Sequence, residues 1–158
     1  MKQFFLVAAI AAMFSILLGI SSCSTDKCQN VTCQNGGTCN NGNCNCPPGY
    51  SGANCQTAAN DQFIGTFVGQ INCGGGASAA SQPITAGLNG SPFSILLLSP
   101  PDNLNATVSG NSLTIPYQTF ADGNTFSGSG TINGNSLSIT LILTSSGTTT
   151  TCYFTGTN

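Results

Sequence analysis

Cysteine supplies most of the side chains in this sequence that could do chemistry. Nine cysteines occur among the 158 residues: Cys23, Cys28, Cys33, Cys39, Cys44, Cys46, Cys55, Cys73 and Cys152. So high a density of thiols in a short chain indicates maturation in an oxidising compartment, where thiols pair as disulfides. An odd number also leaves one cysteine that needs a separate explanation.

Few other residues offer reactive groups. The chain has no His, Glu or Arg, and its charged residues are Lys2, Asp26, Lys27, Asp61, Asp102 and Asp122. General acid–base and nucleophilic mechanisms mostly depend on His, Glu, Lys or a polarised Ser or Cys, so we expect no catalytic residues and no enzyme. Nucleic-acid binding requires Lys and Arg to neutralise phosphates, and it is excluded. No metal or cofactor is expected either, because the cysteines have a better explanation.

The N-terminus, residues 1–22, is typical of a signal peptide. Lys2 provides a positive start, an apolar run extends from Phe4 to Ile20, and two small residues precede Cys23. Two alternatives stay open. The run could be a retained transmembrane helix near the short limit for spanning, or an ordinary signal with Cys23 as a spare thiol.

The sequence Ile20-Ser21-Ser22-Cys23 resembles the lipobox of bacterial lipoproteins, although Ser22 stands where that family more often has Gly or Ala. The resemblance implies cleavage before Cys23 and acyl chains on that residue, with residues 23–27 as the tether. Two or more acyl chains hold a protein stably on a membrane. We therefore expect an exported protein, lipid-anchored to the outer membrane or cell surface of a Gram-negative bacterium.

Residues 28–55 hold six closely spaced cysteines and few apolar side chains, chiefly Val31 and Tyr50. Such a segment cannot bury enough surface to offset its chain entropy, so it requires crosslinks. Each disulfide that closes a loop of this size contributes on the order of 2–4 kcal/mol. Six cysteines allow fifteen pairings, and their spacing alone does not select one.

Two stretches resemble the EGF-like domain: residues 35–39, Asn-Gly-Gly-Thr-Cys, and residues 44–55, which run from Cys-Asn-Cys-Pro-Pro-Gly-Tyr to the last cysteine of the segment. Asn41-Gly42 is a strong signal for a two-residue hairpin turn. The resemblance implies the pairs Cys28–Cys39, Cys33–Cys44 and Cys46–Cys55.

Calcium is not expected at this module. EGF-like domains that bind calcium carry an acidic pair before the first cysteine, whereas Lys27 occupies one of those positions here. The stretch from Asn40 to Asn43 is also short and lacks an aromatic residue, and a hard cation needs several oxygen ligands. The module is then either a spacer that lifts the next domain off the membrane or a site for a protein partner.

Residues 56–62 form a polar linker, and residues 63–158 predict an all-β antiparallel domain, either a barrel or a sandwich. Short segments there alternate apolar and polar residues, which is typical of half-buried strands. About eight strands are expected: Phe63–Ile71, Pro83–Leu88, Phe93–Leu98, Asn105–Val108, a strand with Leu113 and Ile115, Thr125–Gly130, a strand from Leu137 to Leu143, and Thr148–Thr155. Val108–Ile115 and Ile132–Ile139 resemble each other, which indicates one hairpin type used twice.

Two cysteines remain for this domain, Cys73 and Cys152. If they pair, the first and last strands lie together, as closure of an up-and-down barrel requires. Gly65-Thr66-Phe67 resembles the opening motif of calycin barrels such as lipocalins. The motif's Trp is replaced by Phe67, and the Arg that covers this Trp in that family is absent.

The all-β domain contains few candidate site residues. Asp102 and Asp122 lie in turn sequences, where Asp is common for its local backbone hydrogen bond. Thr148–Thr151 and the other Ser- and Thr-rich strands predict a solvated sheet face, and uncharged polar faces can bind carbohydrate. We therefore expect a surface lipoprotein for binding, adhesion or display, with a protein or carbohydrate partner. The alternatives are a carrier of a small apolar ligand in a calycin-like barrel and, more remotely, a hydrolase.

Overall fold

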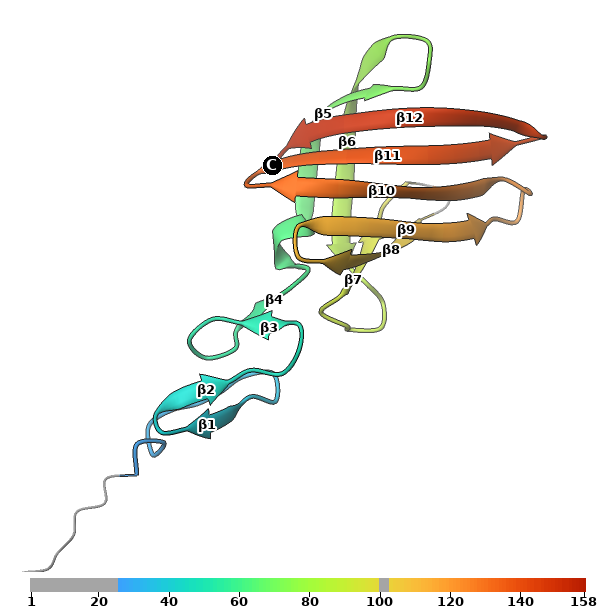
Figure 1. Cartoon of the computed structure of the whole chain (residues 1–158). Helices are drawn as coiled ribbons and strands as arrows, with labels where there is room; N and C mark the ends of the chain where they lie inside the picture. The colour runs from blue at the N-terminus through green and yellow to red at the C-terminus, as the bar shows by residue number, and fades with distance from the viewer. Residues whose placement is uncertain (1–25, 100–102) are drawn as a thin grey trace, which may run out of the picture.

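The computed structural model describes residues 26–99 and 103–158. The chain forms a narrow cysteine-rich module (residues 28–55) followed by a β-barrel, which lies at the upper right of Figure 1. The fold class expected from the sequence is confirmed, and the choice between barrel and sandwich is resolved in favour of the barrel.

The cysteine-rich module is built on a short hairpin. Strands β1 (Thr38–Asn40) and β2 (Asn43–Asn45) pair with Asn40 opposite Asn43, so the connecting turn has two residues. These are Asn41 and Gly42, with φ of 52° and 87°. A type I′ turn needs positive φ at both central positions, and Asn-Gly is the sequence that best tolerates this.

A second small sheet joins the end of the module to the region expected to be a linker, residues 56–62. Strand β3 (Tyr50–Ser51) pairs with β4 (Thr57–Ala58), and a single 3₁₀ turn, η1 (Asp61–Phe63), leads into the barrel. Phe63 was expected at the start of a strand, but it belongs to η1, where its side chain is fully buried against the barrel core. Among the described residues no helix has both the length and the apolar composition to cross a membrane.

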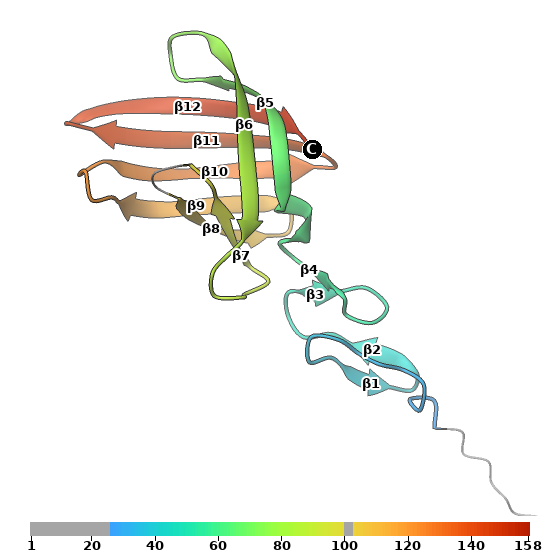
Figure 2. The ribbon, with the colours of Figure 1, turned by 180° about the vertical axis from the view of Figure 1, so that it is seen from behind.

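Eight antiparallel strands form the barrel: β5 (Gly65–Asn72), β6 (Ala77–Ala86), β7 (Ser94–Leu97), β8 (Leu104–Ser109), β9 (Ser112–Thr119), β10 (Thr125–Asn133), β11 (Ser136–Ser145) and β12 (Thr148–Thr157). Each strand pairs with the next in sequence, and β12 pairs with β5 to close the ring. Figures 1 and 2 show the two sides, with β9 to β12 in front in the first and β5 to β8 in front in the second. Closure leaves the first and last strands without a free edge along their paired length.

Both ends of β6 differ from the sequence prediction, Pro83–Leu88. Strand β6 begins at Ala77 rather than Pro83, because Ala77 to Gln82 pair with β5 although their Ala and Ser side chains show no apolar alternation. Leu88 was expected inside this strand, but it lies in the following loop and is 90% exposed. Both ends of β6 are set by backbone pairing to the neighbouring strands, and the periodicity of apolar side chains does not indicate this pairing.

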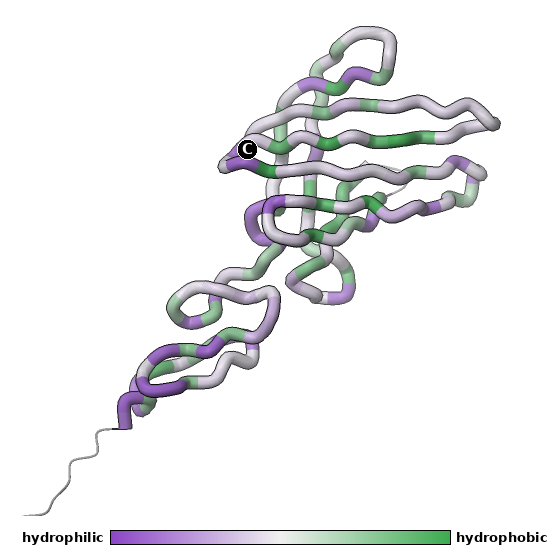
Figure 3. The backbone as a smooth tube through the Cα atoms, viewed as in Figure 1, coloured by the Kyte–Doolittle hydropathy of each residue, from purple (hydrophilic) through white to green (hydrophobic). Residues whose placement is uncertain are grey.

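The barrel interior is filled by side chains from all eight strands and from η1. Along β8 and β9, alternate residues point inward, as expected for a sheet with one buried face. The buried core comprises Phe63, Phe67, Ile84, Ile95, Leu97, Leu104, Ala106, Val108, Leu113, Ile115, Ile132, Leu137, Ile139 and Phe154. The hydropathy colouring in Figure 3 is pale along much of the barrel, because Thr, Ser and Gly dominate the outward positions.

The two similar sequences do form the same hairpin. In β8–β9, Ser109 pairs with Ser112 around Gly110-Asn111, and in β10–β11, Asn133 pairs with Ser136 around Gly134-Asn135. The φ angles of Gly110 and Gly134 are 54° and 57°. Both turns therefore need a residue that tolerates the left-handed region, and glycine provides it.

The module and the segment that follows it contact the barrel at the β6–β7 loop and the start of β7. Asn60, which is 4% exposed, donates from Nδ2 to the carbonyl oxygens of Ser91 (3.3 Å) and Ser94 (2.8 Å). Gly49 lies so close to this loop that an added Cβ would be 2.6 Å from Pro92 Cγ and 2.7 Å from Phe93 Cζ. The hydrogen bonds of the buried Asn60 side chain and the close packing of Gly49 thus join the cysteine-rich part of the chain to the barrel.

Candidate binding face

The six cysteines of the module form three disulfides. Cys28 bonds to Cys39, Cys33 to Cys44 and Cys46 to Cys55, with Cα atoms 5.9, 5.6 and 5.3 Å apart. These are the pairs that the EGF-like pattern implies. Their loops are short, with partners separated by 9 to 11 positions in the sequence, so each crosslink restrains the module locally.

The remaining pair of described cysteines lies in the barrel. Cys73 immediately follows β5 and bonds to Cys152 of β12 across 79 residues of sequence. The bond sits where these two strands separate, next to the paired residues Asn72 and Tyr153. Cys23, the expected lipidation site, lies outside the described residues.

The described Asp residues of the barrel region are engaged in local turns. Asp61 accepts a hydrogen bond at Oδ2 from the Ala58 backbone N–H (2.7 Å). Asp122 accepts at Oδ1 from the Asn124 N–H (2.9 Å) and at Oδ2 from Asn124 Nδ2 (2.6 Å). These contacts match the local role of Asp in turns. Asp102 lies outside the described residues.

Cation ligands do not gather in the part of the chain that the structure describes. Within residues 26–99 and 103–158, no three His, Cys, Asp or Glu side chains lie together as a group that could hold a metal ion.

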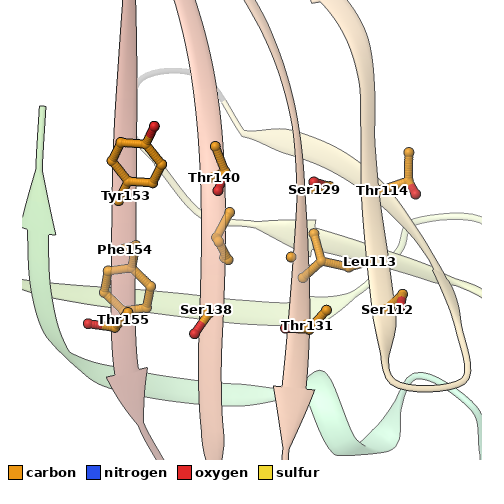
Figure 4. A pocket seen from close by; sticks show the side chains of 12 residues that line it. Ser112, Leu113, Thr114, Ser129, Thr131, Ser138, Thr140, Tyr153, Phe154 and Thr155 are labelled. Atoms are coloured by element: carbon orange, nitrogen blue, oxygen red, sulfur yellow. The ribbon is translucent and has the colours of Figure 1, made fainter.

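One concavity on the barrel lies on the outer face of β9, β10, β11 and β12, and we call it the hydroxyl face. It is a shallow hollow of about 410 Å³. Eight hydroxyl-bearing side chains from these four strands line it: Ser112, Thr114, Ser129, Thr131, Ser138, Thr140, Tyr153 and Thr155. Figure 4 shows these side chains along the four neighbouring strands.

Strand register places the eight hydroxyls in two rows across the sheet. In the first row Tyr153 pairs with Thr140, Thr140 with Ser129, and Ser129 with Thr114. Neighbouring members of a row therefore lie on adjacent strands, whose backbones are about 4.8 Å apart across the sheet.

The second row runs parallel to the first, two residues further along each strand. Thr155 pairs with Ser138, Ser138 with Thr131, and Thr131 with Ser112. The rows are separated by roughly 6.8 Å, the rise of two residues in an extended strand. Together the two rows form a grid of hydroxyl groups.

The same strands supply the barrel core from their inward positions. Leu113, Ile139 and Phe154 each lie between two residues of the hydroxyl face and are buried. Because successive side chains on a strand point to opposite faces, the packing of these three fixes which side of the sheet the hydroxyls occupy. The hydroxyl face is therefore held by a packed interior.

The hydroxyl face is uncharged and mostly open to solvent. No side chain that lines it carries a charge, and Tyr153 is 58% exposed. Among the described residues, its hydroxyls make no side-chain hydrogen bond, whereas Thr144 and Thr149 nearby along the same strands bond to each other (3.0 Å). The eight groups thus keep donors and acceptors available to a ligand.

Sequence patterns indicate this face only in part. They predict solvated Ser- and Thr-rich strands, among them Thr148–Thr151, but these four residues lie outside the hollow and two of them are partly buried. The usable signal was the spacing of hydroxyls two residues apart in four separate strands. Their assembly into one grid depends on register, which no single strand reveals.

Comparison with known proteins bears on the module alone. The EGF-like domain family matches residues 23–55, which covers the six paired cysteines and begins at Cys23. No curated protein and no solved structure matches the chain at a significant level. The chain thus combines an EGF-like segment with an eight-stranded antiparallel barrel.

Proposed function

We propose that this protein is a lipid-anchored surface protein whose barrel acts as a binding head and whose EGF-like module acts as its spacer. The observation that carries the proposal is the combination of a packed barrel interior with an open, polar hollow outside it. A ligand would then be bound on the outer surface of the barrel.

The number of cysteines left after disulfide pairing supports the lipid anchor. Four disulfides use eight of the nine cysteines, which leaves Cys23. That residue directly follows a signal-like segment and completes the lipobox pattern Ile20-Ser21-Ser22-Cys23. Acylation of Cys23 would attach the mature chain to the outer membrane or cell surface of a Gram-negative bacterium.

A spacer role for the module is supported by its position and its small amount of apolar surface. It joins the predicted anchor to the barrel, and its second sheet leads directly into η1 and β5. Its crosslinks resist unfolding without a large core, as a stalk on an exposed surface requires.

The packed interior favours surface binding over transport of an apolar ligand. A carrier of the calycin type needs an internal cavity, whereas Phe63, Phe67 and Phe154 belong to the buried core of this barrel together with aliphatic side chains. Asp61 and Asp122 accept backbone hydrogen bonds in local turns, which is the structural role expected of Asp there.

Intact-mass analysis of the membrane-extracted protein after thiol alkylation tests the anchor. The expected mass corresponds to a chain that begins at Cys23, carries acyl chains there and has no alkylated thiol. The matched variant Cys23→Ala should carry no acyl mass while keeping four disulfides. An unmodified Cys23 in the wild type, or acyl mass that persists in Cys23→Ala, would overturn the proposal.

Surface display is tested by adding a protease or a membrane-impermeant label to intact cells. We expect labelling of Lys27 or cleavage near it in the wild-type cells and no change in a cytoplasmic control protein. Protection of the chain until the outer membrane is permeabilised would contradict display at the cell surface.

A further inference from the structure

We infer that the hydroxyl face binds neutral carbohydrate, with Tyr153 as the platform for a sugar ring and the two rows of Ser and Thr hydroxyls as its hydrogen-bond partners. The inference rests on the proposed function, in which the barrel binds at its outer surface, and it names the class of ligand.

The absence of charged side chains on the hydroxyl face favours uncharged ligands over anionic ones. The residues that line the hollow include no Asp, Glu, Lys, Arg or His. The described charges lie elsewhere, at Asp26, Lys27, Asp61 and Asp122. An anionic ligand would therefore lose water without gaining a cationic partner, whereas an uncharged polyol loses little.

The chemistry of the hydroxyls matches that of a sugar. Each Ser or Thr hydroxyl supplies one donor and two acceptor positions, and it can rotate to suit its partner. A pyranose presents groups of the same kind around its ring. Seven Ser and Thr side chains in two rows could thus exchange hydrogen bonds with several adjacent sugar units.

Tyr153 adds the apolar contact that a sugar also requires. It stands at the β12 end of the first row, directly opposite Thr140, and it is 58% exposed. An aromatic ring offers a broad apolar face with a polar tip, so a sugar ring could stack on it while its hydroxyls reach Thr140 and Thr155. Figure 4 shows Tyr153 beside Thr140 on the neighbouring strand.

A protein partner fits this face less well. The centres of protein interfaces are enriched in aromatic residues, Met and Arg, and depleted in Ser, and binding energy concentrates in a few buried anchors. Here one Tyr is accompanied by small hydroxyl residues and by no Arg or Met. The face is therefore better suited to many similar polar contacts along a repetitive ligand than to one protein anchor.

Native affinity electrophoresis with full-length protein in a neutral detergent tests the inference. The gels contain one of four neutral polysaccharides (laminarin, xyloglucan, galactomannan or soluble starch) or the anionic polysaccharide alginate. We expect at least one neutral polysaccharide to retard the protein and alginate to retard it less. Because stacking and the tyrosine hydroxyl are both lost, Tyr153→Ala should weaken binding about tenfold.

Two further variants make the test specific. Tyr117→Ala removes a tyrosine that is 70% exposed on β9 but does not line the hollow, so its retardation should equal that of the wild type. The double variant Thr131→Val, Thr140→Val keeps the side-chain shapes while removing one hydroxyl from each row. It should bind more weakly and unfold at the same denaturant concentration as the wild type.

The possible outcomes separate this inference from the proposed function. Retardation by neutral polysaccharide that is lost in Tyr153→Ala and kept in Tyr117→Ala supports it. Failure of all four neutral polysaccharides, equal binding by the two tyrosine variants, stronger binding of alginate, or a protein ligand on this face would each overturn it. The anchor and display would stand in those cases, because mass analysis and cell labelling measure them independently.

Discussion

Gly69 of β5 lies directly opposite Gly156 of β12, and both residues face the barrel interior at the seam where the first and last strands pair. A Cβ on Gly69 would overlap the backbone carbonyl oxygen of Thr155, and one on Gly156 would lie 2.6 Å from the Phe154 ring. The seam therefore closes only because neither position carries a side chain.

Gly69→Ala is expected to lower the free energy of unfolding by about 1–3 kcal/mol, because the added methyl group meets backbone that cannot move aside independently. Gly75→Ala is the matched control, since Gly75 lies in the β5–β6 turn with no atom within 4 Å of an added Cβ. Its effect should be within about 0.5 kcal/mol, as for most surface changes. Urea unfolding followed by circular dichroism measures both, and equal midpoints for the two variants would contradict the prediction.

The Cys73–Cys152 disulfide restrains the same seam. Replacement of both cysteines by Ser should destabilise the barrel by about 4 kcal/mol, since the bond closes a loop of 79 residues in the unfolded chain. Thermal unfolding of the double variant, with the wild type in reductant as a second measurement, provides the test. A wild-type barrel whose melting temperature does not respond to strong reductant would show that the crosslink contributes nothing to its stability.

Disulfides of the module should act separately from the barrel. Replacement of Cys33 and Cys44 by Ser removes the bond beside the β1–β2 hairpin, and we expect residues 28–55 to become sensitive to protease. The barrel has its own core, which contains no residue of this segment, so its melting temperature should change little. Limited proteolysis with mass mapping, followed by calorimetry, would reveal either result. Loss of the barrel transition in this variant would mean that the two parts fold as one unit.

Asn60, which lies between the module and the barrel, is the buried polar side chain at their junction. Asn60→Ala should lower the free energy of unfolding by about 1–3 kcal/mol, because two hydrogen bonds in a poorly solvated site are lost. The carbonyl oxygens of Ser91 and Ser94 each keep one backbone N–H donor, from Ser94 and Gly87. Asn60→Asp should be at least as destabilising, since it places a carboxylate against two carbonyl oxygens. Gln62→Ala is a suitable control, because that side chain also donates across the junction, to the Gly110 carbonyl oxygen, but is exposed. Comparable losses for Asn60→Ala and Gln62→Ala would argue against a special role for the buried amide.

Local sequence patterns predicted turns and strands correctly where the structure depends on residues that are close in sequence. The Asn41-Gly42 turn, the two Gly-Asn hairpins and the alternation from Leu137 to Leu143 are all found as expected. The errors occurred where backbone pairing or tertiary packing, rather than side-chain periodicity, decided the outcome. Ala77 joins β6 because its backbone pairs with Asn72, and Phe63 belongs to η1 and packs into the barrel core.

The sequence by itself determined the class of this protein: a cysteine-rich EGF-like segment, a hydroxyl-rich all-β domain of about eight strands, and very little charge. These properties follow from composition and from patterns that span a few residues. Tertiary structure alone decided that β12 pairs with β5, and that eight hydroxyls from four strands meet on one outer face. The physical reason is that register between strands is a long-range property, set by inward side chains such as Leu113, Ile139 and Phe154 as they pack together.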